Sequence, residues 1–367
     1  MKRVLFAGGG TGGHLYPGLT LAERLRSEGV EVHFFGSRRG VEVEIVPRFG
    51  FPLHLVKAGR LSRKPVQALV GVLETAVGFA QCLGFLLRHR PDLIVGTGGY
   101  ASAPVALAGA VLGVKLMVLE QNAVPGKVTR LLARFARHVC VSFPESTRWL
   151  PGKRTLVTGN PVRAEILACT QAEGRQRLGL APDRPCLLVT GASQGAVSLN
   201  RAVLRSLPRW SERAWSVLHL TGPKHLEEVE RERSATSSLD YRPLGYLDDM
   251  AAAYAAADLV VCRAGATTLA EVTARGLPAI LVPYPFAAED HQRLNARAAV
   301  KSGAAELLED DQVEAGLGGL VEELLGAGDR LVRMAAASRA LGKPAATEEI
   351  LGLVHALVGD GKETRDD

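Results

Sequence analysis

Short apolar runs alternate with helical stretches along the whole chain of 367 residues, and this alternation constrains the fold more than any other feature. Parallel strands need a crossover connection, usually a helix, so the pattern predicts parallel sheets covered by helices. The runs that we predict as strands are residues 4–7, 30–35, 53–56, 93–96, 115–119 and 138–141 in the first half, and 186–190, 216–221, 258–262 and 279–282 in the second.

A turn-rich break at Gly159, Asn160 and Pro161 separates the two series, and the pattern restarts after it. The chain is long enough for two domains with a core each. The sequence therefore predicts an α/β protein of two doubly wound, Rossmann-like domains that face a cleft. We expect one domain over residues 1–163 and the other over 164–367, with a final helix that can pack back on the first domain.

The two halves differ in charge. Residues 1–163 hold 22 Lys and Arg against 9 Asp and Glu, a net of +13, whereas the remainder has a net of −7. A basic half is typical of a protein that meets phosphates, nucleic acid or an acidic membrane, although a merely solvated basic surface gives the same count.

The cysteines argue against a disulfide framework or a zinc site and favour a reducing compartment, because they are odd in number and form no C-x-x-C pair. They are Cys82, Cys140, Cys169, Cys186 and Cys262. The short apolar run at the N-terminus does not have the length of a signal peptide.

A glycine loop follows the first predicted strand. Residues 8–14 read Gly-Gly-Gly-Thr-Gly-Gly-His, ahead of a helix that we expect to begin near Pro17. The run also fits G-x-G-x-x-G, and Arg38 and Arg39 after the second strand would suit a 2′-phosphate, so an NADP-dependent oxidoreductase is one alternative. His14 argues against it, because a titratable group at the loop's exit has little use in such a fold.

Two later strand-to-helix segments also carry polar groups. Residues 191–196 read Gly-Ala-Ser-Gln-Gly-Ala, where the backbone and Ser193 would bind an anion at a helix N-terminus; a tight turn without ligand is the alternative. Residues 262–271 place Glu271 about two turns into a helix, where its carboxylate could accept hydrogen bonds from a ribose diol. Gln292 and Asn295 suit neutral sugar hydroxyls.

Together and in this order, these segments resemble the MurG family, the family 28 glycosyltransferases that add GlcNAc to the lipid-linked muramyl-pentapeptide of peptidoglycan synthesis. The resemblance covers nearly the whole chain. It rests on residues 9–14, 98–100, 120–122, 159–163, 191–196, 247–250 and 263–271.

The resemblance implies a GT-B fold, with the donor UDP-GlcNAc bound mostly by the C-terminal domain and the acceptor by the N-terminal one. It implies no cofactor and no nucleic acid partner. The donor contacts that it implies are Thr11, Gly12, Gly13, Asn122, Arg163, Ser193, the backbone of Leu247 against uracil, Ala266, Thr267, Thr268, Leu269, Ala270, Glu271 and Gln292.

The sequence departs from the family pattern in two places. Ala103 stands where the family often has Gly, and His291 precedes Gln292 where two glutamines are common. We therefore place the sugar contact on Gln292 and keep His291 as the lesser option.

The implied reaction is an attack of the acceptor 4-hydroxyl on the anomeric carbon of UDP-GlcNAc, with inversion. It needs a general base and stabilisation of the departing pyrophosphate, which helix N-termini can supply without metal. No D-x-D motif ends a predicted strand, since Asp248 and Asp249 are adjacent. His14 is the candidate base because an imidazole titrates near neutrality, and a phosphate or acceptor contact without proton transfer is the alternative.

Other classes of function fit less of the sequence. Another UDP-sugar enzyme of the GT-B fold, either a glycolipid transferase or a UDP-GlcNAc epimerase, shares the donor motifs. The NADP alternative leaves the second and third loops unexplained. A non-catalytic binding module would usually keep one half of the pattern, and both halves are here.

Residues 65–87 form an almost wholly apolar helix on which Gln67, Glu74 and Gln81 make one narrow polar stripe. Such a helix is deeply buried or touches lipid, and Glu74 argues against a membrane span. The basic residues just before it are Lys57, Arg60, Arg63 and Lys64. With the resemblance, this predicts a peripheral protein on an anionic membrane surface, at the cytoplasmic face of the cell membrane.

Overall fold

The computed structural model describes residues 1–38, 40–59 and 65–359. It divides into two compact units, one made of Met1–Pro161 with the chain from Ala345 onward, and the other of Val162–Pro344. The change of unit after Pro161 falls within the turn-rich break, two residues before the expected boundary. The last helix belongs to the first unit.

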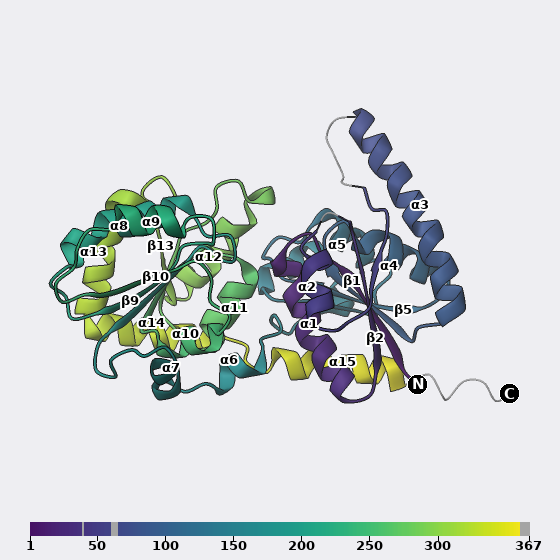
Figure 1. The fold of residues 1–367 in the computed structure, drawn as a ribbon. Helices are drawn as coiled ribbons and strands as arrows, with labels where there is room; N and C mark the ends of the chain where they lie inside the picture. Colours follow the sequence, from purple (N-terminus) through teal and green to yellow (C-terminus); the bar gives the residue numbers. More distant parts are fainter. Residues whose placement is uncertain (39, 60–64, 360–367) are drawn as a thin grey trace. The chain divides into compact units, whose positions relative to one another are not determined.

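In the first unit, the described residues form a parallel sheet in the order β3-β2-β1-β4-β5-β6-β7. Figure 1 labels three of these strands, β1, β2 and β5. Its strands are β1 (Arg3–Gly8), β2 (Glu31–Gly36), β3 (Leu53–Leu55), β4 (Leu93–Gly98), β5 (Lys115–Glu120), β6 (His138–Val141) and β7 (Thr155–Val157). Its helices are α1 (Gly12–Ser27), α2 (Glu42–Arg48), α3 (Pro65–His89), α4 (Ser102–Val111), α5 (Lys127–Leu132) and α15 (Ala346–Gly359), with short 3-10 turns η1 (Pro144–Trp149) and η2 (Gly152–Arg154).

Alternate residues of β1 point to opposite faces of this sheet, as the period of a strand requires. Val4 and Phe6 pack with α1 and α15, whereas Leu5 and Ala7 pack with α3, α4 and α5. Both faces are therefore covered, which explains why the strands read as continuous apolar runs.

Most of helix α3 lies outside the core. One stripe, with Gly71, Gly78, Cys82 and Leu86, is buried, while Val66, Leu69, Val70, Val72, Leu73, Val77 and Leu87 are exposed. Among the described residues this helix is long and apolar enough to cross a membrane, and only a small part of it is buried. Length and composition are weak evidence for a membrane span, because a helix in the core of a protein can have both. A core helix, however, would not expose so many apolar side chains.

In the second unit, the described residues form a parallel sheet in the order β10-β9-β8-β11-β12-β13. Its strands are β8 (Cys186–Thr190), β9 (Ser216–Leu220), β10 (Asp240–Leu244), β11 (Leu259–Cys262), β12 (Ala279–Leu281) and β13 (Ala305–Leu307). Its helices are α6 (Ala164–Ala168), α7 (Gln171–Arg177), α8 (Val197–Trp210), α9 (Leu226–Glu232), α10 (Met250–Ala256), α11 (Ala266–Ala274), α12 (His291–Lys301), α13 (Val313–Gly326) and α14 (Gly328–Leu341), with the 3-10 turn η3 (Ala288–Asp290).

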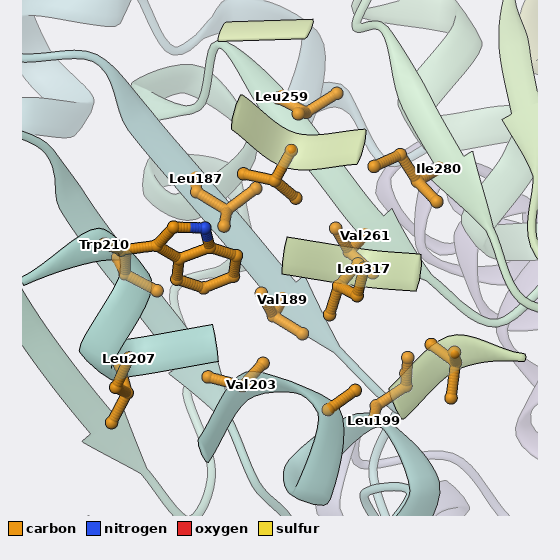
Figure 2. Packing of buried hydrophobic residues seen from close by; sticks show 14 of the residues in the cluster. Leu187, Val189, Leu199, Val203, Leu207, Trp210, Leu259, Val261, Ile280 and Leu317 are labelled. Carbon is orange, nitrogen blue, oxygen red and sulfur yellow. The ribbon is translucent and has the colours of Figure 1, made fainter. Parts of the chain in front are cut away.

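Helices α8 and α13 cover one face of the second sheet. Figure 2 shows Leu187, Val189 and Val261 of the strands facing Leu199, Val203 and Leu207 of α8, with Leu317 of α13 and the large Trp210 closing the cluster. Trp210 is fully buried, and its indole N–H donates to the carbonyl oxygen of Gly318 at 3.1 Å. A buried indole needs such a partner.

All ten predicted strands are present, with ends that differ by at most two residues. Three more strands, β7, β10 and β13, were not predicted. Each sheet has its switch of strand order beside its first strand, between β1 and β4 and between β8 and β11. Ligands of doubly wound sheets bind at this point, beyond the carboxyl ends of the strands.

Candidate functional site

The first glycine loop leaves the carboxyl end of β1 at this switch point. Gly9 and Gly10 have φ angles of 145° and 89°, which strain other residues, and a Cβ on Gly9 would lie 2.3 Å from the carboxyl carbon of Glu42. Thr11 is the N-cap, its side chain makes no capping bond, and α1 begins at Gly12, earlier than the expected start near Pro17. The predicted donor contacts Thr11, Gly12 and Gly13 therefore occupy the start of a helix.

A buried carboxylate, which the sequence analysis missed, holds this loop. Glu42 is fully buried, and its Oε2 accepts the Gly10 N–H at 2.7 Å. Its Oε1 accepts the N–H and the hydroxyl of Ser37 at 2.8 and 3.0 Å. The Ser37 hydroxyl also lies 3.3 Å from that of Tyr100. Three hydrogen-bond donors thus replace water around one carboxylate and fix the loop. Glycines like those near Glu42 occur in many loops. The sequence alone therefore does not show that a buried carboxylate lies beside them.

His14 lies in the first turn of α1, where three neighbouring strands end. The strands are β1, β4 and β5, and β5 leads into Gln121. The His14 Nδ1 lies 2.9 Å from Oε1 of Gln121. A Cβ added to Gly98 would lie 2.8 Å from the same Nδ1. The structure therefore packs His14 against the segment 98–100, which the sequence treated as a separate motif.

Asn122 follows Gln121 and is held by the neighbouring Glu120. The buried Oε1 of Glu120 accepts the backbone N–H of Asn122 at 3.0 Å and its side-chain amide at 3.4 Å. Its Oε2 accepts the N–H of Gly126 at 3.2 Å. Glu120 thus positions the amide of Asn122 near the end of β5, and like Glu42 it was not among the predicted site residues.

A cavity of about 650 Å³ opens in the second unit at the corresponding end of its sheet. This size is ordinary for a small-molecule site. The loops after β8, β9, β11 and β12 line it, and its charged lining residues are Arg201, Lys224, Arg263, Asp310 and Glu314. Arg263 pairs with Asp310 at 2.6 Å, so Arg201 and Lys224 leave the lining positive beside Glu314.

The second glycine loop forms part of this cavity. Gly191, Ala192 and Gln194 line it, and Ala192 has a φ of 63°, unusual for a residue with a side chain. Helix α8 begins after the loop, and its N-cap, Ala196, has no side chain that could cap it. Ser193 is exposed and is not among the lining residues, so the structure does not bring its hydroxyl to this cavity.

Glu271 lies at a different place, in an ion pair. Its Oε1 accepts hydrogen bonds from Nε and Nη2 of Arg163 at 3.2 and 3.0 Å, and Glu271 is 6% exposed. Burial raises the pKa of Glu271, although the Arg163 charge and the hydrogen bonds from Arg163 and Tyr254 act in the opposite direction. Burial also raises the pKa of Tyr254 well above its usual range. The structure thus joins two predicted donor residues that are far apart in the sequence.

Helix α11 contains the end of the third strand-to-helix segment, residues 262–271. It begins at Ala266 after the N-cap Gly265, and of the predicted residues 266–271 only Thr268 lines the described cavity. Leu269 is buried in the core, so its side chain cannot contact a ligand, and a donor contact there must use the backbone. Thr267 and Ala270 are half-buried.

Gln292 lines the cavity, as a sugar contact requires, but its Oε1 accepts the N–H of Tyr284 at 2.9 Å. The neighbouring His291 donates from Nδ1 to the carbonyl oxygen of Ala288 at 2.7 Å, and it is not among the lining residues. Since a carbonyl oxygen only accepts, Nδ1 of His291 carries the proton. Leu247 is half-buried in the loop before α10, outside this cavity.

Asp249 has a structural explanation. Its Oδ1 accepts the N–H of Ala252 at 2.9 Å and caps α10. Across the ranges 1–38, 40–59 and 65–359, the structure shows no group of three His, Cys, Asp or Glu side chains arranged for a metal ion.

Comparison with known proteins gives consistent matches over both units. The model of the glycosyltransferase family 28 N-terminal domain matches residues 4–141, and that of the glycosyltransferase family 28 C-terminal domain matches residues 186–350. A protein of Chlorobaculum parvum is 45% identical, over 97% of this chain and 99% of its own length. One of Halothermothrix orenii is 40% identical, over 96% of this chain and 98% of its own. Both are named UDP-N-acetylglucosamine--N-acetylmuramyl-(pentapeptide) pyrophosphoryl-undecaprenol N-acetylglucosamine transferase.

Solved structures agree. The crystal structure of Acinetobacter baumannii MurG matches with a TM-score of 0.78 and 28% identity, over 97% of this chain and all of that one. A UDP-GlcNAc 2-epimerase from Neisseria meningitidis matches with a TM-score of 0.67 but 12% identity, over 97% of this chain and all of that one, so that likeness concerns the fold alone. The fold is GT-B, as predicted. On both family models and on relatives that match over almost the whole chain, this protein belongs to glycosyltransferase family 28.

Proposed function

We propose that the protein transfers GlcNAc from UDP-GlcNAc to the 4-hydroxyl of the MurNAc of a polyprenyl-pyrophosphoryl-MurNAc-pentapeptide, with inversion. This is the lipid I to lipid II step of peptidoglycan synthesis. The observation that carries the proposal is the full-length match to a 45% identical transferase whose name states this donor and this acceptor. Membership of family 28 removes the basis for the NADP alternative.

Each unit has a separate role in this proposal. The second unit binds most of the donor, through Arg163, Ser193, Leu247, Gln292 and residues 266–271. The first unit binds the acceptor and carries the further donor contacts Thr11, Gly12, Gly13 and Asn122. Two features support the division: the positive lining of the cavity in the second unit suits a diphosphate, and the glycine loop of the first unit carries an imidazole at a helix start.

His14 is the general base of the proposed reaction. The acceptor hydroxyl gives its proton to the imidazole while its oxygen bonds to the anomeric carbon. The bond from that carbon to the pyrophosphate oxygen breaks, and UDP leaves with the electron pair. Support comes from the position of His14 at the switch point of the first sheet and from its fixed ring. The N-termini of α1, α8 and α11, which no side chain caps, are suited to stabilise phosphate charge.

We also propose that the protein docks peripherally on the cytoplasmic face of the membrane, because its acceptor is carried there by a polyprenyl chain. Helix α3 supports this with exposed apolar side chains along most of its length. Of the basic residues expected beside it, Lys57 is described, whereas Arg60, Arg63 and Lys64 lie outside the described residues. Basic side chains near an anionic leaflet contribute about 1 kcal/mol each.

The test is incubation with UDP-GlcNAc labelled in the sugar, with and without a lipid-linked MurNAc-pentapeptide, followed by organic extraction. Label should enter the organic phase only when the acceptor is present. An altered free sugar formed without acceptor would instead indicate an epimerase, and transfer to a glycolipid lacking MurNAc would indicate a different transferase.

A further inference from the structure

Gln121 makes its hydrogen bond to the proposed base and has little other structural use. Its side chain is almost wholly inaccessible, with 2% of the residue exposed, and its Oε1 lies 2.9 Å from Nδ1 of His14. Its amide nitrogen Nε2 has no hydrogen-bond partner within the described part of the chain. A buried amide that served only the fold would be expected to satisfy both ends, so this one calls for a different explanation.

The surroundings of His14 keep the ring where Gln121 can reach it. The backbone at Gly98 comes so close that an added Cβ would be 2.8 Å from Nδ1, and one at Gly99 would be 3.7 Å from Cδ2. The loop that carries the ring is itself fixed through the bond from Gly10 to Glu42. The nitrogen that faces Gln121 is therefore Nδ1, and Nε2 is the one left for a substrate.

The two ends of an amide have opposite consequences for the imidazole. An amide oxygen only accepts, so a bond from Nδ1 to Oε1 places the proton on Nδ1 and leaves a lone pair on Nε2. An amide nitrogen only donates, so the reversed amide would place the proton on Nε2, which could then not accept another. The positions of oxygen and nitrogen within an amide are assigned from the hydrogen-bond network. The choice between the two orientations of Gln121 therefore depends on which tautomer of His14 each orientation produces.

We propose that Gln121 is a positioning residue that accepts the Nδ1–H of His14 and so keeps Nε2 as the unprotonated nitrogen that removes the proton of the acceptor hydroxyl. The proposal rests on the proposed function, in which His14 is the base. The proposal adds the group that determines which ring nitrogen of His14 carries the proton. Carbonyl and carboxylate oxygens have this role beside many functional histidines.

The first test does not depend on activity. In uniformly ¹⁵N-labelled protein without substrate, the two ring nitrogens of neutral His14 are distinguished by long-range proton–nitrogen correlation, with His14→Gln for assignment. We expect the Nδ1–H tautomer. A neutral His14 that carries its proton on Nε2 would overturn the proposal.

The second test uses Gln121→Glu and Gln121→Leu. The carboxylate of Gln121→Glu accepts from Nδ1 and stabilises the imidazolium, so the acidic limb of the kcat profile should move to higher pH by about one unit, with kcat at high pH within a few-fold of the parent. Gln121→Leu should lower kcat about 10- to 100-fold and leave the KM for UDP-GlcNAc within a few-fold. Gln176→Glu adds the same charge at an exposed site of the second unit and should leave the limb in place.

Equal losses in both Gln121 variants with an unmoved acidic limb would show a merely structural residue and overturn the proposal. His14→Ala is measured beside them. If that variant keeps its turnover, the base assigned in the proposed function is wrong and the catalytic part of this proposal with it, whatever tautomer the spectra show. If it loses turnover while the spectra show an Nε2 proton, the base stands and the role of Gln121 does not.

Discussion

At the scale of single residues, two buried carboxylates and one buried amide of the first unit each hold a neighbouring group in place. Glu42 holds the glycine loop, Glu120 holds Asn122, and Gln121 holds His14. None of them is solvent-exposed. The hydrogen bonds of these residues go to other groups of the protein and not to a ligand. Their effect is to fix the groups that we propose contact the ligand.

We predict that His14→Ala lowers turnover by roughly two to four orders of magnitude, the usual contribution of a general base. Donor affinity should stay within a few-fold, because the ring is proposed to act on the acceptor. Steady-state kinetics and calorimetry with UDP-GlcNAc measure the two effects, and His355→Ala, at an exposed histidine of α15, is the control. A fall in turnover of less than about tenfold would mean that another group takes the proton.

Glu271 is predicted to bind the donor ribose, and Glu271→Gln should weaken UDP-GlcNAc binding by about 1–3 kcal/mol. The amide keeps the shape and an acceptor for Arg163, whereas alanine would remove both hydrogen bonds that Arg163 donates to Glu271. Calorimetry on folded protein gives the affinity. Glu165→Gln is the matched control, because Glu165 lies 4.0 Å from the same Arg163 but is largely exposed. Unchanged affinity in Glu271→Gln would remove it from the ribose role.

The sequence singles out the residues that we propose face a ligand, but not the residues that hold them. Glycines and a histidine at strand ends form local patterns, and so His14 and residues 191–196 stand out as candidates. Glu42 and Gln121 act on residues 32 and 107 positions away in the chain, and nothing local marks them. Arg163 and Glu271 are also far apart in the sequence, so their ion pair could not be derived from either segment alone.

At the scale of secondary structure, the strands that escaped prediction are the ones with the weakest pattern. β7, β10 and β13 are the terminal strands of their sheets, and three of the four sheet edges consist of them. β10 contains Pro243, which cannot donate a ladder hydrogen bond and is tolerated at an edge. Central strands, buried on both faces, gave apolar runs, whereas the half-buried edge strands β7, β10 and β13 did not.

The edge strand β10 is joined to the core by a buried histidine. His219 of β9 lies 2.8 Å from the Tyr241 hydroxyl of β10 and 3.0 Å from the Asn200 side-chain oxygen of α8. Burial lowers the pKa of His219 to about 3. The unfolded chain, in which a histidine has a pKa near 6.5, therefore binds more protons between about pH 3 and 6.5, so acidification through this window favours unfolding.

We predict that the second unit loses up to about 1.4 kcal/mol of unfolding free energy per pH unit below 6.5 through this group, and that His219→Gln has a flatter pH dependence. Urea titrations between pH 7.5 and 5 measure it. Trp210 and Trp215 report on this unit when Trp149 is changed to Phe. His355→Gln, in the first unit, should leave the slope unchanged; an equal slope in His219→Gln and the parent would contradict the assignment.

Helix α3 provides the element-scale test of membrane docking. Leu69→Ser with Leu73→Ser removes two exposed apolar side chains, and because partial insertion of two leucines is worth about 2 kcal/mol, binding to anionic liposomes should weaken about 30-fold. Val300→Ser with Val332→Ser, on the second unit, is the control. Binding of the parent should require anionic lipid and weaken with salt. If the parent ignores anionic liposomes at low salt, α3 is not a docking surface.

At the scale of the whole molecule, the chain builds two doubly wound sheets and then returns to the first. Helix α15 adds Ile350, Leu351 and Val354 to the core of the first unit, and Lys115 donates to the carbonyl oxygen of Leu357 at 2.6 Å. The sequence led us to expect a final helix that can pack back on the first domain, and α15 lies in the first unit. The number of units and their order followed from the repeated pattern.

The central claim is a chemical one, that a single GlcNAc passes from UDP to the muramyl 4-hydroxyl with inversion. The structure of the product tests it most directly, by mass spectrometry and NMR after reaction of the enzyme with UDP-GlcNAc and a lipid-linked MurNAc-pentapeptide. We predict an acceptor that carries one added N-acetylhexosamine, β-linked to O4 of MurNAc, and one UDP released per sugar transferred. An α linkage, a different position, or release of UDP with a free sugar and an unchanged acceptor would contradict the account.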